Sequence, residues 1–235
     1  IGGSGDDSVP SFKNLVAFET RLMELSEADG GKFKLAVASL SGGTPGSFER
    51  WKELLVPLIK RAGEGGHIYF RHAYGPGLLT KEDGSATDGN SGRPFKEAEY
   101  LRSQGILTPM VITEAGPNAG YDFPGASEFV KDVKRFDALC QQHDNIWGFC
   151  CWTYGDWRDG APNIQPASSR LARYLKEQGA VSRPAYPNPA IVGSGPAEPP
   201  SEPVETPAAG TLAYKMTFDI GVETNHVKPG QRFSP

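Results

Sequence analysis

The chain is 235 residues long, and its 38% hydrophobic and 22% charged content is ordinary for a globular protein with one sizeable core. The formal net charge of -4, without a clustered Lys/Arg stripe, argues against nucleic acid or an anionic membrane as the main partner. No apolar run approaches the roughly 20 residues that span a bilayer, and the N-terminus lacks the basic and apolar regions of a signal peptide.

Helices and strands are predicted to alternate in the first half of the chain. Apolar residues at helical spacing predict one helix from Ser11, its N-cap, to Ala28 and a second from about Ser47 to Ala62. Each helix is followed by a short apolar run that predicts a strand, first at 33–39 and then at 67–74. The segment 75–92 is rich in Gly, Asp, Ser and Pro, so we expect a long loop that is too polar to pack.

The same alternation continues to residue 178. Strands are predicted at 109–114 and 146–152, because both runs are short and apolar and are bounded by turn residues. Helices are predicted at 94–103, 125–143 and 165–178. Helices and strands in this order indicate a parallel sheet with right-handed crossovers.

Polar and aromatic residues gather where these predicted strands end. The ends, at Ser41, Tyr74, Glu114 and Trp152, are 33, 40 and 38 residues apart, a spacing compatible with β/α units that carry variable loops. A doubly wound sheet shares this rhythm, but it would carry a glycine fingerprint after its first strand, and the sequence has none. We therefore expect residues 1–181 to form an α/β domain of the (β/α)8 TIM-barrel type, of which only about the last four β/α units are present.

Two further segments follow the predicted barrel units. Residues 182–210 contain eight prolines and almost no large apolar residue, which predicts a stiff, solvated linker. Within residues 211–235, large apolar side chains alternate with smaller or polar ones from Leu212 to Ile220, as in a half-buried antiparallel strand. We expect this strand to begin a β-sandwich module or to pair with another chain, because one strand cannot form a domain.

Four side chains near the predicted strand ends are candidates for chemistry. His72 and Tyr74 are two residues apart on one strand and so point the same way, whereas Arg71 would face the helices, where it needs a partner. Taken singly, His72 is explained as a structural histidine, Glu114 as a loop-fixing carboxylate and Trp152 as a core side chain. Together, a carboxylate, an imidazole, a phenol and an indole form a group that packing does not require and that suits a sugar ring.

This order, with His72 and Tyr74 on one strand, Glu114 on the next and Trp152 on the last, resembles strands six to eight of the glycoside hydrolase clan A barrels, such as families 5 and 39. The resemblance covers about residues 11–180. In that clan the glutamate ending the seventh strand is the nucleophile of a retaining mechanism, which implies this role for Glu114. The resemblance likewise implies that Tyr74 and His72 orient the nucleophile and that Trp152 floors the sugar subsite.

A retaining mechanism also needs a second carboxyl group, about 5 to 5.5 Å from the first. In the clan, it belongs to an Asn-Glu pair that ends the fourth strand. Counting back one unit from Ser41 places that strand end at residues 1–8, where no Asn-Glu pair occurs. We expect either an acid in a missing N-terminal half or substitution by Asp6 or Asp7. The chain alone is expected to be inactive, and its half barrel to be completed by the missing half or by another copy of the chain.

Loop residues beyond the strand ends are predicted to bind substrate by stacking and hydrogen bonding, and ordinary polar loops with anchoring aromatic residues are the alternative. These candidates are Asn118, Tyr121, Phe123, Tyr154, Asp156, Trp157 and Asp159. The three cysteines lack metal-ligand spacing, so we expect no metal and no cofactor. Cys140 and Cys151 either form a disulfide or stay free thiols.

The favoured interpretation is a retaining glycoside hydrolase, or a fragment of one, that acts on a β-linked polysaccharide or glycoside. A non-catalytic carbohydrate-binding barrel and a structural, self-assembling fragment are the alternatives. The chain begins with Ile and ends soon after the strand at 212–220, so we expect a piece of a longer protein. Residues 229–233 resemble the opening of an immunoglobulin-like module of bacterial surface proteins, which implies a secreted or cell-surface location.

Overall fold

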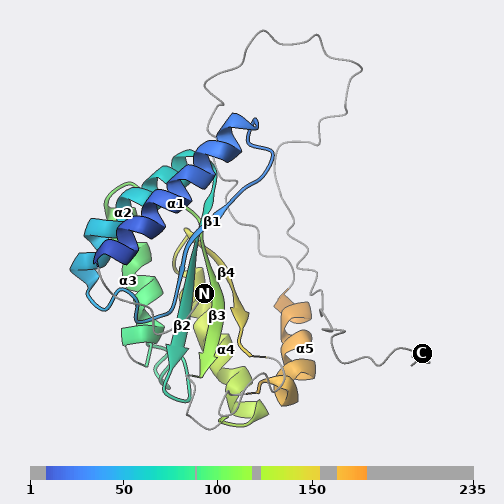
Figure 1. Cartoon of the computed structure of the whole chain (residues 1–235). Coiled ribbons are helices and arrows are strands. Elements are labelled where there is room, and N and C mark those ends of the chain that lie inside the picture. The colour runs from blue at the N-terminus through green and yellow to red at the C-terminus, as the bar shows by residue number, and fades with distance from the viewer. Residues whose placement is uncertain (1–8, 88, 118–122, 154–162, 179–235) are drawn as a thin grey trace, which may run out of the picture.

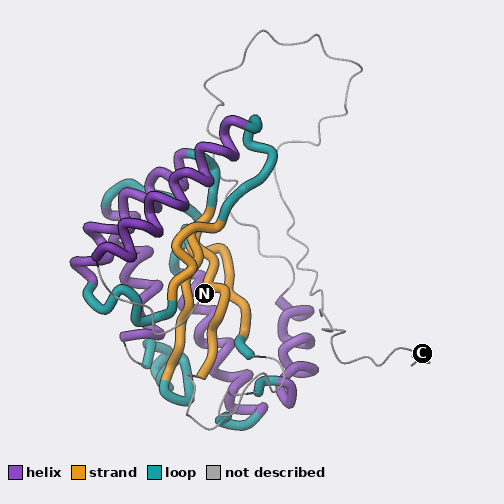
Figure 2. The backbone as a smooth tube through the Cα atoms, in the orientation of Figure 1, coloured by secondary structure: helices purple, strands orange, loops and turns teal. Residues whose placement is uncertain are grey.

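The structure, a computed structural model, describes residues 9–87, 89–117, 123–153 and 163–178. Four parallel strands form one sheet in the order β1-β2-β3-β4, which is their order in the chain (Figures 1 and 2). The strands are Ala36–Leu40 (β1), Ile68–Gly75 (β2), Met110–Pro117 (β3) and Ile146–Cys151 (β4). The helices are Val9–Ala28 (α1), Phe48–Glu64 (α2), Gly89–Ser103 (α3), Ala126–Gln141 (α4) and Ser168–Gln178 (α5), with a 3-10 turn at Gln165–Ala167 (η1).

The predicted alternation of helices and strands and the predicted parallel sheet are confirmed. The α/β arrangement is compatible with part of an α/β barrel. Because β1 and β4 lie at opposite edges of the sheet, the residues that the structure describes do not form a closed barrel. In the same residues, no helix is long and apolar enough to cross a membrane.

The two faces of the sheet differ in burial. Along β2, Tyr69, Arg71 and Ala73 are fully buried, whereas the alternating residues, among them His72 and Tyr74, are only half-buried. Helices α2 and α3 pack against β2, and α4 packs against β4. His72 and Tyr74 therefore lie on the face opposite the helix-covered one, as strand alternation predicted.

Helix α2 supplies the centre of the main core. Ser47 caps it by accepting a hydrogen bond from the backbone N–H of Arg50 at 3.3 Å. Trp51, Leu55 and Ile59 recur at helical spacing and are fully buried. A second, smaller apolar cluster joins α4 to α5 and consists of Phe129, Val133, Ile164, Ala167, Leu171 and Tyr174.

Several predicted boundaries are wrong. Helix α1 begins at Val9, so Ser11 lies inside the helix and is not its N-cap; Pro10 suits the first turn because it has no N–H to satisfy. Strand β1 begins at Ala36 instead of Phe33, because side chains hold the preceding segment: the Leu35 backbone N–H donates to Nδ1 of His67 at 3.1 Å. The helix expected at 165–178 is a 3-10 turn followed by α5.

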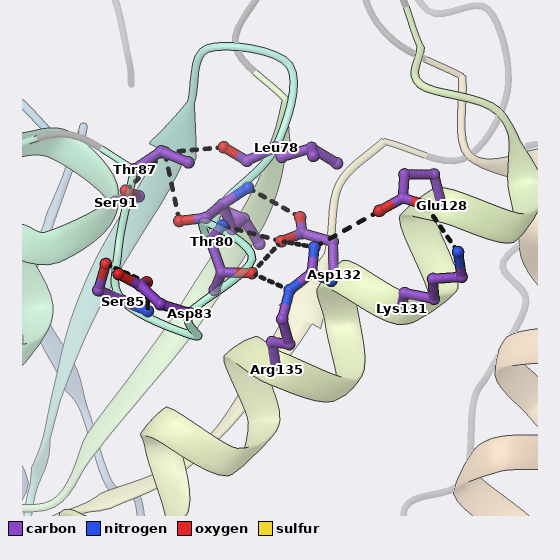
Figure 3. A network of polar contacts seen from close by, with 11 residues as sticks. Leu78, Thr80, Asp83, Ser85, Thr87, Ser91, Glu128, Lys131, Asp132 and Arg135 are labelled. Carbon is purple, nitrogen blue, oxygen red and sulfur yellow. Dashed lines mark hydrogen bonds and ion pairs between the residues drawn. The ribbon is translucent and has the colours of Figure 1, made fainter.

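The segment 75–92, expected to be an unpacked loop, is packed against α4 (Figure 3). Leu79 and Thr80 are fully buried. The carboxylate of Asp132 accepts hydrogen bonds from both of their backbone N–H groups at 2.8 Å and from the Thr80 hydroxyl at 2.5 Å. Arg135 Nε donates to the same hydroxyl at 2.8 Å. The sequence did not reveal this packing because the partners lie more than 50 residues further along the chain.

Inside this segment the chain forms a small hairpin. Thr80 and Ala86 form an antiparallel bridge, and the Thr87 backbone N–H donates to the Leu79 carbonyl at 2.9 Å. The Thr87 hydroxyl lies 3.1 Å from that of Ser91, in the first turn of α3. Helix α3 consequently begins at Gly89, earlier than the predicted start at Pro94.

The cysteines are free thiols, so the disulfide alternative for Cys140 and Cys151 is wrong and the free-thiol alternative is confirmed. Cys140 is buried in the main core, whereas Cys151 packs against the α4–α5 cluster. The two side chains thus belong to different apolar clusters. Cys150 is exposed.

Candidate active site

An extra residue in β3 places Glu114 on the same face of the sheet as His72. Ile112 is fully buried like its partner Arg71, so strict alternation would turn Thr113 to the half-buried face and Glu114 back toward the helices. Ile112 pairs with Arg71, but the next pair is Glu114 with His72, so one residue of β3 is skipped. The register with β4 is irregular at the same place. β-Bulges re-aim side chains in this way and are frequent beside active sites.

The Glu114 carboxylate lies where the two side chains of β2 converge. Its Oε2 atom accepts a hydrogen bond from the Tyr74 hydroxyl, and Nδ1 of His72 lies 3.3 Å from the same oxygen. The His72 and Tyr74 rings meet edge to face, with centroids 6.0 Å apart. The side chains of His72 and Glu114 are 12% and 24% exposed, so the group is shielded from bulk water but reachable by a ligand. The predicted catalytic residues are thus brought together.

His72 is neutral near pH 7. Burial, and then the positive charge of Arg71, lower the pKa of its imidazole to about 4. With a neutral imidazole the contact with Glu114 is not an ion pair; Nδ1, the nitrogen that faces the carboxylate, lies 3.3 Å from its Oε2 atom.

Trp152 follows β4 directly and lies beside the end of β3. Its backbone N–H donates to the Ala115 carbonyl at 2.9 Å, and the Trp152–Thr153 peptide bond is cis. A Cβ on Gly116 would lie only 2.1 Å from the Trp152 carbonyl oxygen, so this close approach requires glycine. The half-buried indole thus belongs to the strand end that adjoins Glu114.

Most of the predicted loop contacts lie outside the described residues. These are Asn118, Tyr121, Tyr154, Asp156, Trp157 and Asp159, together with the candidate acids Asp6 and Asp7. Phe123 is described and packs on Phe129 with ring centroids 5.4 Å apart. It therefore anchors its loop to the α4–α5 cluster, which is the alternative given above.

Arg71, expected to need a partner, has several. Its side chain is fully buried, and Nη2 lies 3.1 Å from Oε1 of Glu97, which is also fully buried. Nη1 donates to the carbonyls of Ser41 and Thr44 at 3.0 and 2.5 Å, and Nη2 donates to that of Gly42 at 3.0 Å. The guanidinium thus holds the segment that follows β1.

Glu97 is the shared acceptor of this buried network, and the sequence reasoning missed it. Arg93 Nε donates to its Oε1 at 2.6 Å, and the Tyr69 hydroxyl donates to its Oε2 at 2.6 Å. Trp51 Nε1 in turn donates to the Tyr69 hydroxyl at 3.3 Å. The four-residue spacing of Arg93 and Glu97 on one helix is the signal that predicts their pairing. Nothing in the sequence predicted that Arg71 joins them.

Two other features are separate from the Glu114 group. A surface hollow of about 460 Å³ lies between the hairpin and α4, with Asp83, Ser85, Arg135 and Gln142 in its lining. None of its lining residues contributes to the Glu114 group. In the described part of the chain, no three His, Cys, Asp or Glu side chains form a metal-binding cluster.

Comparisons of the chain with protein-family models, curated proteins and solved structures find no significant match. The geometry of the site and the residue pattern therefore carry the functional argument.

Proposed function

We propose that the chain carries the nucleophile of a retaining glycoside hydrolase that acts on a β-linked polysaccharide or glycoside. The observation that carries the proposal is the convergence of the Tyr74 hydroxyl and the His72 imidazole on one oxygen of Glu114. The Tyr74 hydroxyl donates to this oxygen and the His72 imidazole lies beside it, so two side chains of the neighbouring strand hold the carboxylate in place. A fixed, partly shielded carboxylate is what attack on an anomeric carbon needs.

In this reaction Glu114 would attack the anomeric carbon as the glycosidic C–O bond breaks. The leaving oxygen takes a proton from a general acid, and a covalent glycosyl ester forms on Glu114. Water, deprotonated by the same second group, then attacks the anomeric carbon and releases the sugar and the Glu114 carboxylate. Tyr74 and His72 hold the nucleophile throughout, and Trp152 offers an apolar surface for the ring.

The second carboxyl group is the part of the proposal that the described residues do not supply. Its candidates in this chain, Asp6 and Asp7, lie outside them. An N-terminal half barrel or a second copy of the chain is the proposed alternative source. The prediction that the chain alone does not cleave ordinary glycosides follows from this proposal.

The test separates the nucleophile from the acid. Dinitrophenyl 2-deoxy-2-fluoro-β-glycosides carry a leaving group that needs no protonation, so they trap a nucleophile even without its acid partner. The proposal predicts a covalent mass increase with one of the gluco, manno, xylo or galacto reagents, and none in Glu114→Gln. Glu99→Gln, which removes an exposed carboxylate on α3, serves as the control that stays reactive. A chain that none of the four reagents labels contradicts the proposal.

A carbohydrate-binding site without catalysis is the second candidate. The same side chains support it, because a neutral imidazole, a phenol and a carboxylate can all form hydrogen bonds with sugar hydroxyls. The side chains of His72 and Glu114 are 12% and 24% exposed, so a sugar can reach them. This candidate predicts that β-linked oligosaccharides perturb the His72 and Trp152 NMR signals while no reagent labels Glu114. We also propose that the parent protein is secreted or on the cell surface.

A structural role is the third candidate, in which residues 211–235 pair with another chain. It predicts that removing these residues changes the size of the assembly in solution, measured by light scattering. If the number of chains per particle is the same with and without residues 211–235, this candidate is contradicted.

A further inference from the structure

The buried Arg71 is a feature that the proposed function does not use. Its side chain is fully buried on the helix-covered face of β2, although it is adjacent in the chain to His72. Burying a guanidinium costs free energy unless it is paired and hydrogen-bonded, and an apolar side chain of similar volume often serves stability as well. Because Arg71 lies next to His72 in β2, on the opposite face of the sheet, we infer that it has a role other than packing.

The charge of Arg71 is only partly neutralised. Arg71 and Arg93 both contact the single carboxylate of Glu97, so two positive charges face one negative charge within this network. Arg71 also donates hydrogen bonds to the backbone carbonyls of residues 41, 42 and 44. A positive charge thus lies on the opposite face of the sheet from the His72 imidazole.

The segment held by Arg71 also lies close to the His72 backbone. A Cβ placed on Gly42 would lie 3.3 Å from the backbone oxygen of His72 and 3.4 Å from Cβ of Asn90. The Arg71 hydrogen bond to the Gly42 carbonyl, at 3.0 Å, fixes this contact. The position of the His72 backbone is therefore coupled to the position of the guanidinium.

We propose that Arg71 is a positioning residue of the Glu114 site, which fixes the 41–44 segment on the His72 backbone and acts through its charge on the imidazole that lies beside Glu114. A neutral imidazole leaves the full negative charge on the carboxylate. An imidazolium would form an ion pair with Glu114 and weaken it as a nucleophile. This last consequence rests on the proposed function, whereas the effect on His72 does not.

The other groups around His72 set the balance. Tyr74 on the same strand and Glu114 on β3 face the imidazole, and Asn90 of α3, beside the 41–44 segment, carries no charge. The Glu114 carboxylate favours the protonated imidazole. Burial and the charge of Arg71 oppose it, and the resulting pKa of His72 is about 4.

The test is the titration of the His72 imidazole, followed by NMR in the full chain and assigned with His72→Gln. We expect Arg71→Gln to raise the midpoint by about 1 pH unit or more and Arg71→Lys, which keeps the charge, to leave it low. Arg93→Gln is the matched control, because it breaks a contact to the same Glu97 but is not adjacent to His72; its shift should be less than half as large. A folded Arg71→Gln variant with the wild-type midpoint, or an equal shift in Arg93→Gln, overturns the proposal.

Glu97→Gln provides a second variant should Arg71→Gln not fold. It removes the negative partner, so the His72 midpoint should fall below that of the wild type, while Glu99→Gln on the exposed side of α3 leaves it unchanged. An unchanged or raised midpoint in Glu97→Gln contradicts the role of Arg71.

In the trapping assay, Glu114 of the Arg71→Gln variant should be labelled at least about 10-fold more slowly than Glu114 of the wild type. If the wild type is not labelled at all, the proposed function fails, and the titration still decides the role of Arg71.

Discussion

Tyr74 reaches Glu114 diagonally across the sheet, although the two residues are not partners in the strand register. Glu114 lies opposite His72, and Tyr74 lies opposite Gly116, yet the Tyr74 hydroxyl donates to Oε2 of Glu114. The bulge at Thr113 turns the carboxylate to this face, and the length of the phenol spans the diagonal. Two side chains of one strand thereby act on one oxygen of the next.

Removing the Tyr74 hydroxyl should remove the hydrogen bond from Tyr74 to Glu114. Tyr74→Phe keeps the ring and loses the donor, so we expect a stability loss of only about 0.5–1.5 kcal/mol. The labelling of Glu114 by the fluoro-glycoside should slow by about 10- to 100-fold, because the carboxylate is no longer fixed. Tyr100→Phe, at a half-buried tyrosine packed on Trp51, is the control. Wild-type labelling kinetics in Tyr74→Phe would show that the contact does not orient the nucleophile.

His72 should make the fold less stable in acid. Its folded pKa of about 4 lies below the ordinary 6.5, so the unfolded chain binds the proton more readily between these values. Stability is therefore unaffected above pH 6.5 and falls as the pH drops from 6.5 toward 4. From pH 7 to 5 we expect His72 to contribute a loss of about 2 kcal/mol in urea unfolding. His72→Gln should lack this part of the loss; an identical pH dependence in both proteins contradicts the assignment.

Glu19 should act in the opposite direction. It lies on α1, and both carboxylate oxygens accept from the Ala38 backbone N–H at 3.0 and 3.1 Å. Burial raises its pKa from 4.5 to about 7, so the folded chain binds the proton more tightly and stability falls as the pH rises from 4.5 to 7. Glu19→Gln keeps an acceptor oxygen and should be more stable than the wild type at pH 8 by on the order of 1–3 kcal/mol. The difference should vanish near pH 4.5, and Glu24→Gln, at an exposed site, should show none.

Asp132 should hold the hairpin that follows Tyr74. Three groups donate hydrogen bonds to the Asp132 carboxylate, and in Asp132→Asn the amide N–H₂ would face one of these donors instead of an acceptor oxygen. We therefore expect the free energy of unfolding in urea to fall by about 2–4 kcal/mol. Trypsin should then cut faster after Lys81, in the hairpin. Glu128→Gln removes the same charge from the same helix but none of these bonds. Equal effects of the two substitutions would contradict the anchoring role.

The sequence predicted those elements whose signals are local. Helix α2 carries its N-cap and its apolar face in one continuous stretch, and its bounds were predicted to within two residues. The His72–Tyr74 pair was placed on one face because the strand period is two. Glu114 was identified as the end of an apolar run, without any signal for the bulge that aims it.

The missed features depend on distant partners. Asp132 binds Leu79 and Thr80 from more than 50 residues away, so the polar composition of the hairpin by itself predicts an unpacked loop. Glu97 was missed because a carboxylate inside a helix gives no indication that a buried arginine from a strand will meet it. In both cases polar groups are buried because they pair with residues far away in the sequence, and local composition does not predict such pairing.

The most direct test of the central claim is to locate the trapped sugar. After reaction with the fluoro-glycoside that adds mass to the intact chain, proteolysis and fragmentation should place the ester on the side chain of Glu114. Tyr74→Phe should acquire the same adduct more slowly, and Glu114→Gln should acquire none. An adduct on another carboxylate, or labelling that persists in Glu114→Gln, would contradict the account.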